Sequence, residues 1–221
     1  MKNIVLFFVW ILAILAATVA VRYLQAAPND DQQLANIRID HDIDIENQPF
    51  TIFYDVMRGT GIPAGIAQVT ACSGLPNARL KVQQGATIPE AMDAFVATNP
   101  TYRWIPAGRV VNLELRGGVA LLNTKIRGIQ IDSTDRDIPA ILQDLLRLPV
   151  ARRRTAELGL TPALGQGGPS AVDEHPVPKR PLPIHIWISN VSLRDAFNTL
   201  VRTWGHTIWI YRETDCARSK T

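Results

Sequence analysis

The stretch Thr87-Ile88-Pro89-Glu90-Ala91-Met92 recurs 105 residues later, without a gap, as Ser192-Leu193-Arg194-Asp195-Ala196-Phe197. The correspondence continues beyond it: Phe95-Val96, Thr98 and Trp104 are matched by Leu200-Val201, Thr203 and Trp209. The paired residues are identical or chemically alike, with the exception of Pro89 and Arg194. Such self-similarity is typical of a chain built from copies of one small unit.

Both stretches predict an amphipathic helix, because their apolar residues stand at i, i+3, i+4, i+7 and i+8. Thr87 with Glu90, and Ser192 with Asp195, have the spacing of a capping box at the start of each helix. A second resemblance, shifted by 89 residues, links Ile52-Phe53-Tyr54-Asp55-Val56-Met57-Arg58 to Ile141-Leu142-Gln143-Asp144-Leu145-Leu146-Arg147. It predicts an earlier helix in each copy.

Short segments with the alternation or composition of β-strands flank the predicted helices. They are residues 37–39, 43–45, 80–83, 102–105 and 110–115 in the first copy, and 129–131, 184–188 and 207–211 in the second. The predicted fold class is therefore α+β, with two tandem small units, each of two helices packed on a small mixed β-sheet. We place the first unit at residues 37–116 and the second at 125–213.

The two shifts differ by 16 residues, so the second unit carries an insertion between its helices. We place it at about 162–183, where glycines and prolines are dense. Prolines at this density are excluded from helix and sheet interiors, so the segment is predicted to be a surface connector. A proline-rich peptide ligand at residues 176–181 is the alternative.

The N-terminus contains an unbroken apolar run from Ile4 to Val21, within a segment that we bound at residues 1–27. As a helix, these 18 residues would span roughly 27 Å, close to the hydrocarbon thickness of a bilayer. We favour a retained inner-membrane anchor; the alternative is a cleaved signal peptide, which would leave a periplasmic or secreted protein. In either case the remaining chain is expected outside the cytoplasm, in the cell envelope.

The charge of the chain gives no nucleic-acid footprint. Lys2 and Arg22 supply two of the three net positive charges, so the remainder is nearly neutral. The one basic cluster, Arg152-Arg153-Arg154, is read as a solvated helix end, with an anionic lipid or an acidic partner as the alternative. No aromatic residues are interleaved with these arginines, as a nucleic-acid surface would require.

Two cysteines, Cys72 and Cys216, suit an oxidising compartment and could form a disulfide. Such a bridge would tie the end of the second unit to a loop of the first. The sequence alone does not show whether the two Cα atoms come within reach of one another.

At the level of the whole unit, the chain resembles the short N-terminal (STN-like) domains of secretins and TonB-dependent transducing receptors. The resemblance rests on the helix at residues 50–58 with its 59–63 turn, the strand at 78–84, the helix that begins at 88–92 and the hairpin at 102–115. It covers residues 37–116 well and 125–213 loosely. It implies a periplasmic module that contacts other envelope proteins or peptide segments through sheet edges and helix faces.

No catalytic, metal or cofactor constellation is evident, so we expect a non-enzymatic interaction protein. The cluster from His41 to Glu46 is read as a solvated strand face, with a hard-cation site as the alternative. The predicted partner-binding edge is the last strand of the second unit, which lacks a covering strand: Thr207, Ile208, Trp209, Ile210, Tyr211 and Arg212. The alternative function is binding of a small ligand or glycan in the cleft between the units, with Trp104 and Trp209 as stacking surfaces.

Overall fold

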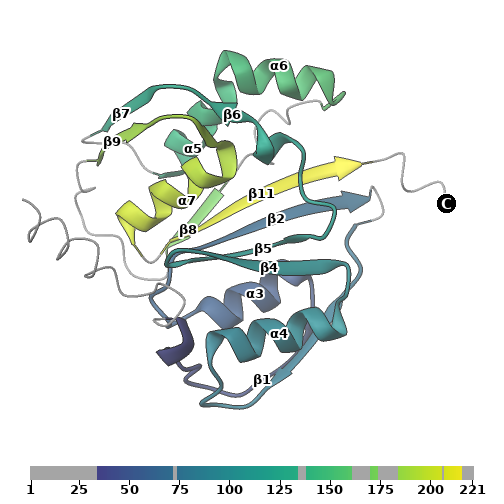
Figure 1. Ribbon diagram of the computed structural model, residues 1–221. Helices are drawn as coiled ribbons and strands as arrows, with labels where there is room; N and C mark the ends of the chain where they lie inside the picture. The colour runs from purple at the N-terminus through teal and green to yellow at the C-terminus, as the bar shows by residue number, and fades with distance from the viewer. Residues whose placement is uncertain are drawn as a thin grey trace, which may run out of the picture.

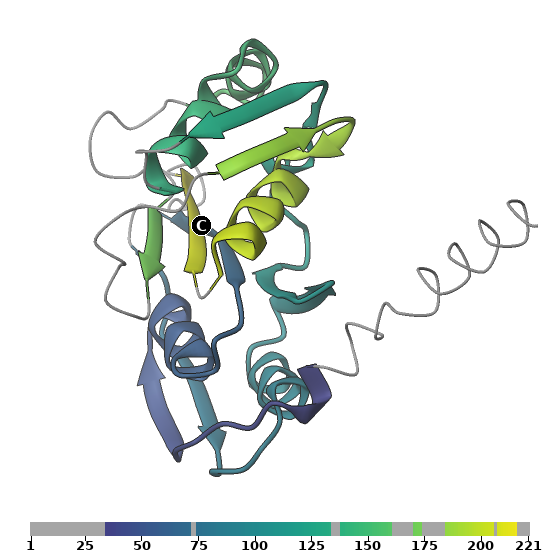
Figure 2. The same ribbon diagram turned by 90° about the vertical axis from the view of Figure 1, so that its left-hand side faces the viewer.

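The structure, a computed structural model, describes residues 34–71, 74–133, 138–160, 170–173, 184–205 and 207–215. The fold is α+β, as predicted. Figure 1 shows helices on both faces of one central sheet, with a further small sheet outside each helix layer. Figure 2 shows the same layers from the side.

The central sheet has five strands in the order β4-β5-β2-β11-β8. Strands β4 (Tyr102–Ala107) and β5 (Val110–Leu115) form the predicted hairpin. Strand β2 (Ala64–Ala71) runs parallel to both β5 and β11 (Thr207–Asp215). Strand β8 (Ser170–Asp173) completes the sheet antiparallel to β11.

One face of this sheet is covered by helices α3 (Pro49–Met57) and α4 (Ile88–Thr98), which lie below it in Figure 1. Beyond them lies an antiparallel pair, β1 (Ile43–Asn47) with β3 (Ala78–Val82). These elements come from the first half of the chain and form one hydrophobic core with the lower face of the sheet.

The opposite face is covered by helices from the second half of the chain, α5 (Ile138–Arg147) and α7 (Leu193–Trp204). A second antiparallel pair, β7 (Ile129–Ser133) with β9 (Ile184–Ile188), lies outside them. The remaining elements of this half are the helix α6 (Pro149–Glu157), the short strands β6 (Lys125–Ile126) and β10 (Val191–Ser192), and the 3-10 turn η1 (Leu121–Asn123).

Strand β11 contributes to both hydrophobic cores, because successive side chains of a strand point to opposite faces. Ile208 and Ile210 pack with the first-half helices, whereas Trp209 and Tyr211 pack with the second-half helices. Residues Thr207 to Tyr211 are buried. The central sheet therefore joins the two halves of the chain.

Both predicted capping boxes are confirmed. The Thr87 hydroxyl accepts a hydrogen bond from the Glu90 amide, and the Glu90 carboxylate accepts one from the Thr87 amide at 2.7 Å. Ser192 and Asp195 make the same reciprocal pair. Each box satisfies backbone donors that the first helical turn leaves unpaired.

The prediction that residues 207–212 form an exposed edge is wrong. Strand β11 pairs with β2 on one side and, from Thr207 to Ile210, with β8 on the other. The prediction that residues 162–183 form a surface connector is also corrected, because Ser170–Asp173 within this insertion forms strand β8. Strand β8 covers the edge of β11 that was predicted to be open. This short segment, Ser-Ala-Val-Asp, contains neither glycine nor proline.

Several predictions concern residues outside the described part of the chain. The apolar run Ile4–Val21, Cys72, Cys216 and most of the 162–183 insertion belong to this group. Among the described residues, no helix combines the length and the apolar composition needed to cross a bilayer.

Candidate functional site

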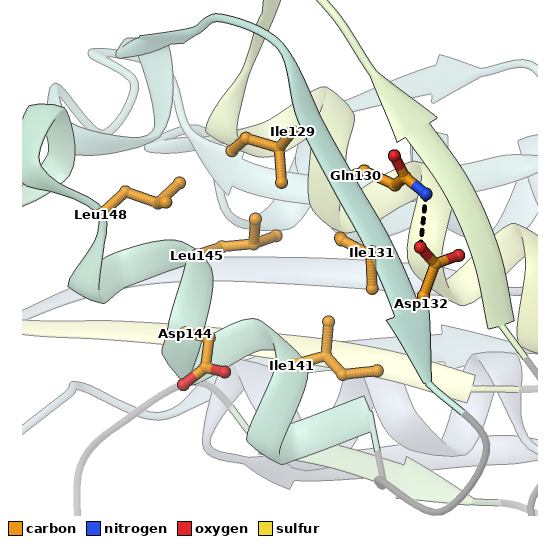
Figure 3. A pocket seen from close by; sticks show the side chains of 8 residues that line it. All are labelled: Ile129, Gln130, Ile131, Asp132, Ile141, Asp144, Leu145 and Leu148. Atoms are coloured by element: carbon orange, nitrogen blue, oxygen red, sulfur yellow. Dashed lines mark hydrogen bonds between the residues drawn. The ribbon is translucent and has the colours of Figure 1, made fainter.

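A groove of about 170 Å³ lies between strand β7 and helix α5 (Figure 3). Alternate residues of β7, one face of α5 and the residue directly after α5 supply its apolar lining, whose members are Ile129, Ile131, Ile141, Leu145 and Leu148. Gln130, Asp132 and Asp144 complete it. Ile129, Ile131 and Leu148 are only partly buried, so the groove offers apolar surface to solvent.

The groove lies along a free strand edge. Strand β7 pairs with β9 on one side, and no described residue pairs with its other side. Figure 3 shows helix α5 beside that edge rather than a further strand. Unpaired N–H and C=O groups therefore border the apolar lining, which is the arrangement that an added strand recognises.

The outer face of the β7–β9 pair carries polar and aromatic side chains. Gln130 is opposite Trp187, and Asp132 is opposite His185. The Asp132 carboxylate lies 2.9 Å from His185 Nδ1 and 2.5 Å from Gln130 Nε2. The bond with His185, followed by the bond from Gln130, holds the pKa of the Asp132 carboxyl below its usual value. Trp187 is 66% exposed.

The two tryptophans of the predicted ligand-binding alternative are both committed to packing. Trp209 is 1% exposed, and its Nε1 donates to Asn198 Oδ1 at 2.8 Å. Trp104 is half-buried, and its Nε1 donates to Asp93 Oδ1 at 2.7 Å. Trp209 therefore has no face free to stack on a ligand.

The acidic cluster around strand β1 is engaged by the protein itself. Asp44 lies 3.5 Å from Lys81 and 3.9 Å from Arg79 on the neighbouring strand β3. Asp42 accepts a hydrogen bond from the Gln84 amide at 2.8 Å. Within the described ranges, no three His, Cys, Asp or Glu side chains gather in a way that could hold a metal ion.

The groove was not predicted from the sequence, although its parts were. Ile129 and Ile131 have the alternation of a strand, and Ile141 and Leu145 have helical spacing. Each pattern indicates that one face of its element is buried. Neither pattern shows that a groove remains between β7 and α5.

Comparison with protein-family models, curated proteins and solved structures finds no match for this chain.

Proposed function

We propose that this chain is a non-enzymatic interaction module of the cell envelope that binds an extended peptide segment of a partner protein along strand β7. The observation that carries the proposal is the groove between β7 and α5, which combines a free strand edge with an apolar lining. The proposed mode is strand addition, in which backbone hydrogen bonds supply affinity and alternate side chains supply specificity.

The proposed architecture is two related units, as in the STN-like family that the sequence resembles. Contacts repeat at the 105-residue shift: Trp104 bonds Asp93, and Trp209 bonds Asn198. The capping boxes at Thr87 and Ser192 repeat at the same shift. These pairs support a common origin for the 37–116 and 125–213 units.

The chemistry of the groove defines the segment that would fit. Apolar side chains at alternate positions of a bound strand would point towards Leu145, on α5, and Leu148, which directly follows this helix. The side chains between them would point away, towards the solvent side of the β7–β9 pair. We therefore expect a partner segment with alternating apolar and polar residues and no proline at its centre.

The proposed location is the periplasmic side of the inner membrane, with Ile4–Val21 as a retained anchor. A reporter enzyme that functions only outside the cytoplasm, fused after Thr221, should be active. Activity of a reporter that functions only in the cytoplasm would contradict this topology.

Site-specific photo-crosslinking tests the binding mode. A photoreactive amino acid at Ile131, inside the groove, should capture a defined partner segment in living cells, whereas the same probe at Val150, outside the groove, should not. Ile129→Glu or Leu148→Glu should abolish capture from position 131, because a charge would enter the apolar lining. Val150→Glu should leave it unchanged.

Two outcomes would contradict the proposal. One is equal capture from positions 131 and 150. The other is capture from position 131 that survives both groove substitutions. Thermal unfolding of each variant should accompany the crosslinking, so that loss of capture is read only from folded protein.

A further inference from the structure

We propose that the end of the molecule formed by helix α6 and the β7–β9 pair docks on an anionic phospholipid surface. Both views place these elements at the same end of the molecule, away from α3 and α4 (Figures 1 and 2). The inference rests on the proposed function, because it requires the chain to be held at a membrane.

Four cations at this end make no ion pair with any described residue. They are exposed, and they come from the turn around β6 and from α6: Lys125, Arg127, Arg152 and Arg153. The neighbouring arginines differ, since Arg154 lies 2.9 Å from Glu157 and Arg147 lies 3.6 Å from Asp144. The unpaired cations form what we call the basic end.

Exposed apolar side chains accompany these cations. Val150, on α6, is 39% exposed, and Trp187, on β9, is 66% exposed; they are the large hydrophobic side chains that the described part of the chain exposes most. A Cβ placed on Gly128 would lie 3.9 Å from the Trp187 ring, so the indole adjoins the turn that carries Arg127.

This combination favours a lipid surface over an acidic protein. Tryptophan is enriched at the level of the lipid headgroups, where its ring is partly dehydrated and its N–H remains in polar surroundings. Arginine and lysine side chains near an anionic leaflet are attracted to its phosphates, and each side chain adds its own contribution to the binding free energy. A tether such as the Ile4–Val21 run would raise the local concentration of lipid, so that four cations suffice.

The test uses the full chain in nanodiscs of phosphatidylcholine alone, or of phosphatidylcholine and phosphatidylglycerol in equal parts. Amide hydrogen exchange in residues 125–132 and 149–157 should slow only in the anionic discs. The protection should disappear in about 1 M salt, where the Debye length falls to about 3 Å.

Charge reversal gives the matched comparison. Arg152→Glu with Arg153→Glu should reduce the lipid-dependent protection by about tenfold or more. Arg109→Glu with Arg212→Glu makes the same change in net charge at exposed arginines outside the basic end and should have no effect. Trp187→Ala should reduce the protection without altering its dependence on salt.

The outcomes separate the two proposals. Equal protection in both lipids, or equal loss in both charge-reversal pairs, would overturn the lipid inference and leave the peptide groove standing. Protection that appears only after an acidic envelope protein is added would overturn it in favour of a protein partner. Recovery of the chain outside the discs would overturn the lipid inference and the proposed anchor, whereas the peptide groove is tested separately by the crosslinking.

Discussion

Arg194 Nη2 lies 2.6 Å from Glu114 Oε2, and this ion pair joins helix α7 to strand β5 of the central sheet. The Glu114 side chain is 1% exposed and that of Arg194 is 16% exposed. The other carboxylate oxygen accepts hydrogen bonds from Arg103 Nε at 2.9 Å and Nη2 at 2.5 Å. One buried carboxylate is thus held by an arginine from each half of the chain.

Arg194→Met should lower the free energy of unfolding by about 3 kcal/mol, because it leaves a buried charge with a single, half-exposed partner. Arg202→Met, on the same helix, removes only a surface hydrogen bond to the Ala107 carbonyl and should cost less than about 1 kcal/mol. Urea unfolding measures both values. Similar losses of unfolding free energy in the two variants would show that the buried ion pair stabilises the fold no more than the surface hydrogen bond does.

Gly65→Ala should be strongly destabilising. A Cβ at this position would lie 2.0 Å from Cε2 of Trp209, the residue opposite it on β11. Overpacking of this kind costs about 1–3 kcal/mol or more, and both Gly65 and the indole are buried. Gly117→Ala is the matched control, since nothing lies within 4 Å of a Cβ there. Thermal unfolding should therefore show a lower Tm for the first variant only.

The interface between the halves could not be predicted from the repeat. Local patterns predicted helices α3, α4, α5 and α7, the capping boxes and most strands, because periodicity and capping act over a few residues. The contact at Arg194 depends on residues 80 positions away. Its trace in the sequence is the mismatch of Arg194 with Pro89, the one chemically unlike pair in the stretch Thr87–Met92.

Strand β2 was missed, and the edge at β11 was wrongly predicted, for a single physical reason. A strand buried on both faces shows no alternation of apolar and polar residues. Ala64-Gly65-Ile66-Ala67 lacks alternation, and Thr207-Ile208-Trp209-Ile210-Tyr211 is apolar after its first residue. The second run is typical of a central strand rather than an exposed edge, and β8 supplies the neighbour that the repeat pattern lacked.

The two tryptophans at equivalent positions should respond differently to the same substitution. Trp209→Phe should cost about 1–3 kcal/mol, because it leaves the buried Asn198 Oδ1 without its donor. Trp104→Phe should cost less than about 1 kcal/mol in hydrogen bonding, since water can reach the exposed Asp93. Chemical denaturation of the two variants measures the difference. Equal costs would mean that ring packing, rather than the buried hydrogen bond, determines the effect.

Asp132, at the polar side of the groove, should titrate below its usual 3.8, because hydrogen bonds from His185 and then Gln130 favour the carboxylate. A carboxyl whose pKa is lowered by folding stabilises the fold above the pKa of the unfolded chain. That contribution is lost as the pH falls through the lower, folded value. Carbon-detected NMR titration should show the midpoint of Asp132 rising towards 3.8 in His185→Ala.

His41→Ala is the matched control for this titration. It removes the histidine that lies 2.6 Å from Asp40 and lowers the pKa of that carboxyl, so it should raise the midpoint of Asp40 and leave that of Asp132 in place. Gln130→Ala should move Asp132 upwards by less than His185→Ala does, because the histidine bond is the larger cause. An Asp132 midpoint that is unchanged in His185→Ala would show that this pair is not formed in solution. The side chains of Asp132 and His185 would then not be held together on the outer face of the β7–β9 pair.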